Sequence, residues 1–183
     1  MRSVAKAELH IHVGGSYPLP FIRSIASSAE YDELCRALDN MNRRMDYHEA
    51  FHIFEIIKNI VNSDDKIEAG TRAICESLAE DNVSYVELRT GLKDLGNGVE
   101  SYLKAILAGI RSFSKSSNKL RAVVILSLRR CSTVAEAQKT LELIKKYGDS
   151  DVAIVGLDIS GDSTVGDAEG INAVIDGKLA SLS

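Results

Sequence analysis

Short runs of apolar and β-branched residues alternate along this chain with longer segments of helical periodicity. The runs predict four strands, at 7–13, 83–90, 121–128 and 152–159. The periodic segments predict helices at 19–29, 31–42, 47–61, 64–80, 99–113 and 134–147. Because strands that alternate with helices usually pair in parallel, the pattern predicts an α/β fold with a parallel sheet.

The last two predicted strands, 121–128 and 152–159, are apolar at nearly every position, which favours helices on both sides of the sheet. Two architectures fit: an open doubly wound sheet and a (β/α)8 barrel. A complete barrel takes about 250 residues. The chain has 183, so its four strands correspond to about half a barrel. No repeat or Pro-rich linker divides the sequence, and we expect one domain.

The composition of the chain argues against some kinds of binding partner and cellular location. A net charge of -4 argues against a nucleic-acid partner, since binding a phosphate backbone needs clustered Lys and Arg. No apolar run reaches the roughly 20 residues of a membrane span, so we expect a cytoplasmic protein. Cys35, Cys75 and Cys131 are too far apart for a CxxC metal pair, and we expect them to be small core residues.

Polar residues gather where the predicted strands end. In parallel α/β folds this edge of the sheet binds ligands. Several cations there would suit a phosphate-bearing substrate, although solvated or paired side chains would give the same pattern. The residues are His10, His12, Gly14, Gly15, Ser16, Arg89, Thr90, Lys93, Arg129, Arg130, Asp158, Ser160, Gly161 and Asp162.

His10 and His12 are the strongest candidates for a metal site. Strand side chains alternate faces, so an i, i+2 pair points the same way and its imidazoles can share one divalent cation. H-x-H alone is a weak signal, and two ordinary histidines would look the same. The following Gly14 and Gly15 let backbone approach a ligand. Asp158 and Asp162 are either further polar ligands or turn-capping residues.

A second metal motif lies at 48–52, where His48, Glu49 and His52 form H-E-x-x-H, the helix motif of zinc proteases. No third ligand follows in the expected pattern. We interpret both histidines as helix-surface residues beside Glu55 and keep a protease as an alternative. The buried stripe of that helix would be Ala50, Phe51, Phe54, Ile57 and Val61.

Taken together, four segments resemble the metal-dependent adenosine deaminase family, and within it the adenosine deaminase-like branch that acts on N6-methyl-AMP. They are KAELHIHVGGS (6–16), NVSYVELRT (82–90), ILSLRR (125–130) and GLDISGDSTVGDA (156–168). The resemblance covers residues 5–168. It implies a (β/α)8 barrel that uses zinc to hydrolyse the six-amino group from a purine nucleoside or nucleotide, such as adenosine or N6-methyl-AMP.

The resemblance also implies roles for individual residues. His10 and His12 match the first two zinc ligands, and Lys93 would favour a nucleotide phosphate. The implied substrate-binding residues are His12, Gly14, Thr90, Gly91, Leu92, Lys93 and Gly161. Three positions depart from the family pattern: Gly14 replaces Asn or Asp, Lys58 replaces His, and Leu128 replaces Asp.

In the family, a third His, the proton-donating Glu, a second-half His and a final Asp come from later strands, and no residues of this chain match them. We therefore expect residues 1–183 to be the N-terminal part of one deaminase barrel domain, with a tail at 169–183 that departs from the family. Such a chain would hold zinc incompletely and have little or no activity alone. A non-catalytic half barrel that binds a purine or a metal is the alternative.

Overall fold

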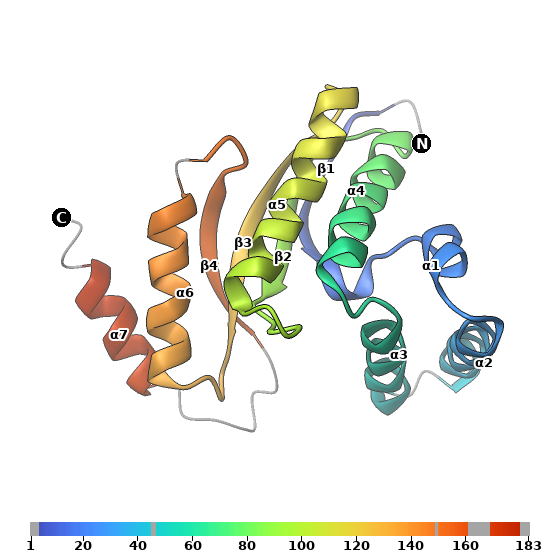
Figure 1. The fold of residues 1–183 in the computed structure, drawn as a ribbon, viewed down its shortest axis with the longest axis horizontal. Helices are drawn as coiled ribbons and strands as arrows, with labels where there is room; N and C mark the ends of the chain where they lie inside the picture. Colours follow the sequence, from blue (N-terminus) through green and yellow to red (C-terminus); the bar gives the residue numbers. More distant parts are fainter. Residues whose placement is uncertain (1–3, 45–46, 149, 161–168, 180–183) are drawn as a thin grey trace.

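The computed structural model describes residues 4–44, 47–148, 150–160 and 169–179. Four parallel strands form one sheet in the order of the sequence, as Figure 1 shows. Every predicted strand is confirmed, with ends within two residues of those expected. The strands are β1 (Lys6–His12), β2 (Val83–Gly91), β3 (Arg121–Arg129) and β4 (Ile154–Ser160).

All six predicted helices are present, but the break between the first two is misplaced and the helix predicted at 99–113 continues to Ser116. The break between the first two falls at Ala26–Ser27, because Ser27 and Glu30 form a reciprocal cap in which the Ser27 amide donates to the Glu30 carboxylate at 2.8 Å. The helices are α1 (Leu19–Ile25), α2 (Ser28–Arg44), α3 (Tyr47–Ile60), α4 (Asp64–Glu80), α5 (Val99–Ser116), α6 (Val134–Tyr147) and α7 (Glu169–Leu179), with a 3-10 turn η1 (Val13–Gly15).

The sheet is wound in one direction. Figure 1 shows α4, α5 and α6 along one face of it, while α1, α2 and α3 extend from one end. The expectation of helices on both faces is wrong for the described residues. Consecutive strands are neighbours, and crossovers of one hand place their helices on one side. This is the arrangement of successive βα units in a barrel, rather than a doubly wound sheet.

The main core lies between the sheet and its helices. Ile106 and Leu107 of α5 are fully buried there, as is Cys75 of α4. The expectation for cysteines fails at Cys35 and Cys131, which are exposed because their helix face and loop lie outside the core. In the described part of the chain, no helix has the length and apolarity needed to cross a membrane.

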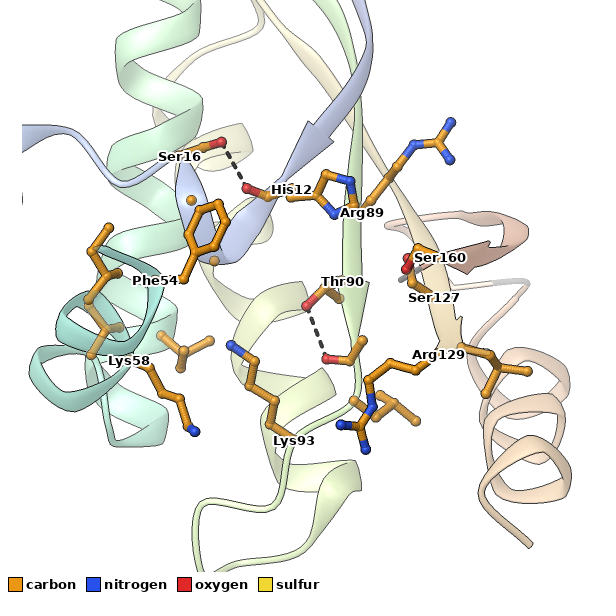
Figure 2. A pocket seen from close by; sticks show the side chains of 18 of the residues that line it. His12, Ser16, Phe54, Lys58, Arg89, Thr90, Lys93, Ser127, Arg129 and Ser160 are labelled. Carbon is orange, nitrogen blue, oxygen red and sulfur yellow. Dashed lines mark hydrogen bonds between the residues drawn. The ribbon is translucent and has the colours of Figure 1, made fainter. Parts of the chain in front are cut away.

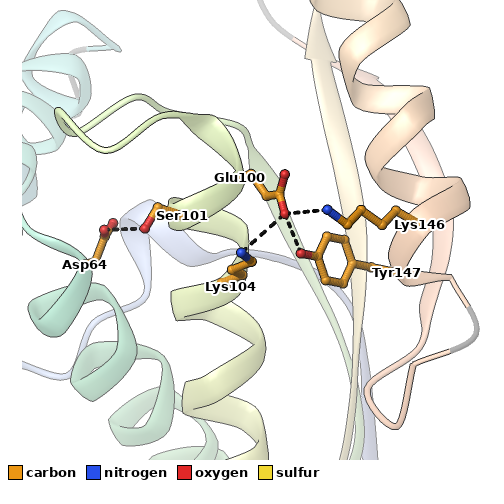
Figure 3. A network of polar contacts seen from close by, with 6 residues as sticks. All are labelled: Asp64, Glu100, Ser101, Lys104, Lys146 and Tyr147. Carbon is orange, nitrogen blue, oxygen red and sulfur yellow. Dashed lines mark hydrogen bonds and ion pairs between the residues drawn. The ribbon is translucent and has the colours of Figure 1, made fainter.

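A smaller apolar cluster joins β3, β4, α6 and α7. It consists of Leu128, Ala137 and Ile171, with Leu157, Ile159 and Ile175 partly buried against it. Polar contacts tie α6 to α5, as Figure 3 shows: the Glu100 carboxylate accepts hydrogen bonds from Lys146 at 2.8 Å and Tyr147 at 2.6 Å. These bonds lower the pKa of Glu100 to about 2.

Candidate functional site

A cavity of about 960 Å³ opens at the carboxyl ends of the strands. Its lining brings together all but one of the site residues expected from the sequence: His10, His12, Gly14, Thr90, Gly91, Leu92 and Lys93. Figure 2 shows several of these side chains around the cavity. Gly161 and Asp162 lie outside the described residues.

The two candidate metal ligands face each other at the end of β1. The Nε2 atoms of His10 and His12 are 3.1 Å apart. Two nitrogens that bind one zinc at about 2.0–2.1 Å in tetrahedral geometry lie roughly 3.3 Å apart, so the pair fits a shared cation. Burial, followed by the neighbouring His10, lowers the pKa of His12. A lowered pKa favours the neutral imidazole that a metal requires.

An irregularity in β1 sets the direction of these histidines. Glu8 and Ile11 are three residues apart, yet they pair with Val86 and Leu88, which are two apart in β2. β1 therefore carries one extra residue, at Leu9 or His10, and the alternation of its side chains reverses there. Downstream, Ile11 packs against the core and His12 faces the cavity opposite Arg89.

Arg89 crosses the cavity floor from β2 to both edge strands of the sheet. Its Nη2 donates to the carbonyl of Leu9 in β1 at 3.2 Å, and its Nη1 lies 3.2 Å from Asp158 in β4. The Arg89 and Asp158 side chains are only 17% and 20% exposed. Ser127 donates a hydrogen bond to the other Asp158 oxygen at 3.2 Å. Arg89 thus joins both edges of the sheet, β1 through a hydrogen bond and β4 through a half-buried ion pair.

The turn after β1 brings backbone and an aromatic ring into the site. Gly15 leaves room for Phe54 of α3, because a Cβ at Gly15 would lie 2.8 Å from the Phe54 ring. Ser16 donates from Oγ to the carbonyl of His12 at 2.8 Å and fixes that end of β1. The glycines predicted to permit close approach therefore admit a protein side chain.

Cationic side chains reach the cavity from two further elements. Lys93 follows β2, its ammonium lies 5.9 Å from the centre of the Tyr102 ring, and burial lowers its pKa, helped by Lys58. Arg129 extends from the end of β3, as Figure 2 shows. Among the described residues, neither Lys93 nor Arg129 forms an ion pair with a carboxylate. This side of the cavity can therefore accept an anion.

Helix α3 differs from its prediction. Ile57 and Val61 are buried as predicted. Phe51 and Phe54, also predicted to be buried, are instead 49% and 48% exposed and line the cavity. Ile53, Ile56 and Ile60 complete the buried side. The helix is apolar over more than one face, so periodicity alone could not select the buried one. His52 is exposed, and the side chain of His48 is outside the described part.

Ser127 is a cavity residue that the sequence reasoning missed. It is the one polar side chain within residues 122–128 of β3, and that interruption of an apolar run was the available signal. No group of three or more His, Cys, Asp or Glu side chains arranged to hold a metal occurs among the residues that the structure describes. The described chain thus offers the His10–His12 pair, without a third ligand of these types.

Comparison with known proteins agrees with this geometry. The adenosine deaminase family model matches residues 5–172. An adenosine deaminase-like protein of Drosophila pseudoobscura is 26% identical over 174 residues, covering 91% of this chain and 51% of the relative. An N6-methyl-AMP deaminase of Danio rerio is 26% identical over 180 residues, covering 95% and 52%.

The structure of Arabidopsis ADAL in complex with IMP superposes with a TM-score of 0.77 at 27% identity, covering 97% of this chain and 57% of that one. The chain therefore spans about half the length of the curated relatives it matches.

The predicted fold class is confirmed: four βα units of a deaminase barrel. The matched family is not one of zinc proteases, so the H-E-x-x-H alternative gains no support. This chain belongs to the adenosine deaminase family.

Proposed function

We propose that this chain forms part of the active site of a zinc-dependent deaminase that hydrolyses the six-amino group of a purine nucleoside or nucleotide, such as adenosine or N6-methyl-AMP. The observation that carries the proposal is the pair of imidazole nitrogens, 3.1 Å apart, at the carboxyl edge of the sheet. Family membership supports this reading of the pair. A cytoplasmic location belongs to the same proposal.

The cavity supports a nucleotide as the substrate. The relatives of this chain include N6-methyl-AMP deaminases. One of its structural neighbours, Arabidopsis ADAL, was solved with IMP, the six-oxo counterpart of AMP. Lys93 and Arg129 offer charge to a phosphate, while Phe54 and Leu92 provide apolar surface for a purine. In this proposal Thr90, Gly91 and Gly14 line the cavity between the phosphate end and the purine end of the nucleotide. Gly161 remains a predicted contact to the purine.

His10 and His12 would hold the zinc ion, which when bound supplies Lewis acidity and a hydroxide nucleophile at neutral pH. Arg89 and Asp158 would support these ligands from below. The departing amine also needs a proton, and the family resemblance assigns that donor to a Glu with no counterpart in this sequence. We therefore infer that the 183-residue chain alone has little or no turnover, and that ligand binding is the property to measure first.

Zinc binding by paired variants tests the proposal. We expect the wild-type chain to bind one zinc ion and H10A/H12A to lose it. The matched control is H48A/H52A, which removes the histidines of the second motif and should bind as the wild type does. Loss of zinc only in H48A/H52A would overturn the deaminase site. Binding of AMP without release of ammonia would favour the non-catalytic half barrel.

A further inference from the structure

We propose that Arg89 is a positioning residue that holds the irregular segment of β1 and thereby aims His10 alongside His12. The inference rests on the metal site of the proposed function. It assigns a role to a side chain that is not among the predicted metal ligands or substrate-binding residues.

A regular β1 would not present these histidines to the cavity. Glu8 pairs with Val86, a fully buried residue on the helix side of β2. Paired residues in parallel strands point to the same side, so Glu8 belongs to the helix side as well. Strict alternation from Glu8 would place His10 and His12 on that side, among the helices. The extra residue turns both rings to the cavity.

The extra residue needs a partner for its backbone. An irregularity disrupts the ladder locally and leaves backbone groups without their regular partners. Arg89 donates to the carbonyl of Leu9, which lies within the irregular segment. The contact is therefore made where the pairing of β1 departs from regular geometry.

Arg89 is held firmly enough to act in this way. Asp158 binds its Nη1 at 3.2 Å, Ser127 in turn holds Asp158, and the guanidinium is mostly buried. The Nε atom of Arg89 is buried with no hydrogen-bond partner. Leaving that donor unpaired carries a cost, and the two outer contacts offset it. A lysine has one donor centre and could not reach both edge strands.

The test measures the side-chain direction of β1 and metal affinity in the 183-residue chain. R89M removes the donors and keeps most of the bulk, R89K keeps the charge, and R72M removes an arginine from the exposed Arg72–Glu76 pair as a matched control. Zinc affinity is measured by competition with a chromophoric chelator, and Co²⁺ absorption reports ligand geometry. The side of the sheet to which each face of β1 turns is measured without metal by the proton NOE between Ile11 and its partner Leu88 in the core.

We expect R89M to keep its fold by circular dichroism, lose the NOE between Ile11 and Leu88, and bind zinc about 10- to 100-fold more weakly. R89K should recover part of that loss, and R72M none of the effect. If R89M does not fold, R89K decides: an unchanged NOE and Co²⁺ spectrum there would overturn the inference.

An R89M chain that retains the NOE and binds zinc as tightly as the wild type would also overturn it. The NOE decides even if the wild-type chain binds no zinc, an outcome that would defeat the proposed metal site and leave Arg89 judged by the side-chain direction of β1 alone.

Discussion

Two regions of this molecule are held together by different means. The main body, which consists of β1–β3 with α1–α5, shares one large core in which α4 and α5 pack closely. The C-terminal unit, which consists of β4, α6 and α7, reaches that core only at its inner side, through residues such as Leu143 and Ile154. Its remaining contacts are a small apolar cluster and exposed ion pairs such as Glu100–Lys146 and Arg111–Asp151. Exposed ion pairs stabilise little, so the C-terminal unit should open more readily.

This difference divides the candidate site. His10, His12 and Lys93 stand on the main body, whereas Asp158 and Ser160 belong to the C-terminal unit. The histidine pair thus rests on the more stable region, and one side of the cavity rests on the less stable one. The following predictions test that contrast, beginning with the largest expected effect.

Truncating one buried side chain in each region should reduce the stability of the two regions by different amounts. I106A empties a fully buried position of α5 and should cost about 2–5 kcal/mol of unfolding free energy. I171A in α7 should change the global transition less and increase amide hydrogen exchange in α7. Urea unfolding and exchange measure the two effects, with V134A, at an exposed position, as the control. Equal global losses in I106A and I171A would contradict the comparison.

Overpacking the helix contact should be the next largest effect. A Cβ at Gly109 would collide with the Glu68 carbonyl and the Thr71 side chain, so G109A forces α4 and α5 apart. We expect a loss of about 1–3 kcal/mol, measured by urea unfolding. G177A is the control, since nothing lies near that glycine of α7. A G109A chain as stable as G177A would show that α4 and α5 are not tightly packed.

A polar contact inside the main body should matter less than its packing. The Asp64 carboxylate accepts hydrogen bonds from Ser101 at 2.6 Å and from Asn97 at 3.0 Å, which ties α4 to the loop that carries Lys93. D64A should lose about 1–2 kcal/mol in thermal or urea unfolding. D64N keeps an acceptor and should lose less. Identical free energies of unfolding for D64A and D64N would show that the hydrogen bonds accepted by Asp64 do not stabilise the main body.

The smallest effect should be the pH dependence of the α5–α6 contact. The pKa of Glu100 is lowered to about 2, so its stabilisation is complete above the ordinary pKa near 4.5 and disappears as pH falls toward 2. Between pH 5 and pH 3, α6 exchange should rise in the wild type relative to E100Q. Matching pH profiles in the two chains would show that the carboxylate adds nothing to the C-terminal unit.

Sequence reasoning recovered the elements because its signal is local. The apolar runs of β3 and β4 mark their own positions along the chain. The strand-end residues that line the cavity were also predictable, since parallel strands end on one edge. The exposed Cys35 and the misplaced start of α2 show where a weak local signal was misread.

The remaining features depend on partners far away in the sequence. The face that α3 buries is chosen by the elements it meets, and Phe54 lies in the cavity because Gly15 leaves space for its ring. The Arg89–Asp158 pair joins strands separated by 69 residues, from position 89 to 158. No local pattern encodes such a contact. The H-x-H spacing correctly suggested neighbouring rings, but which side they face depends on β2.

The irregularity in β1 has a consequence for protein engineering. Insertions and deletions are usually judged by whether a segment stays a strand, and residues 6–12 would remain one after losing a residue. Deletion of Leu9 would nevertheless remove the extra residue, so that strict alternation from Glu8 would return with Ile11 still opposite Leu88 and His12 still opposite Arg89. Both rings would keep their direction and lose only the carbonyl that Arg89 holds, so this one deletion would separate the direction of the rings from the support beneath them.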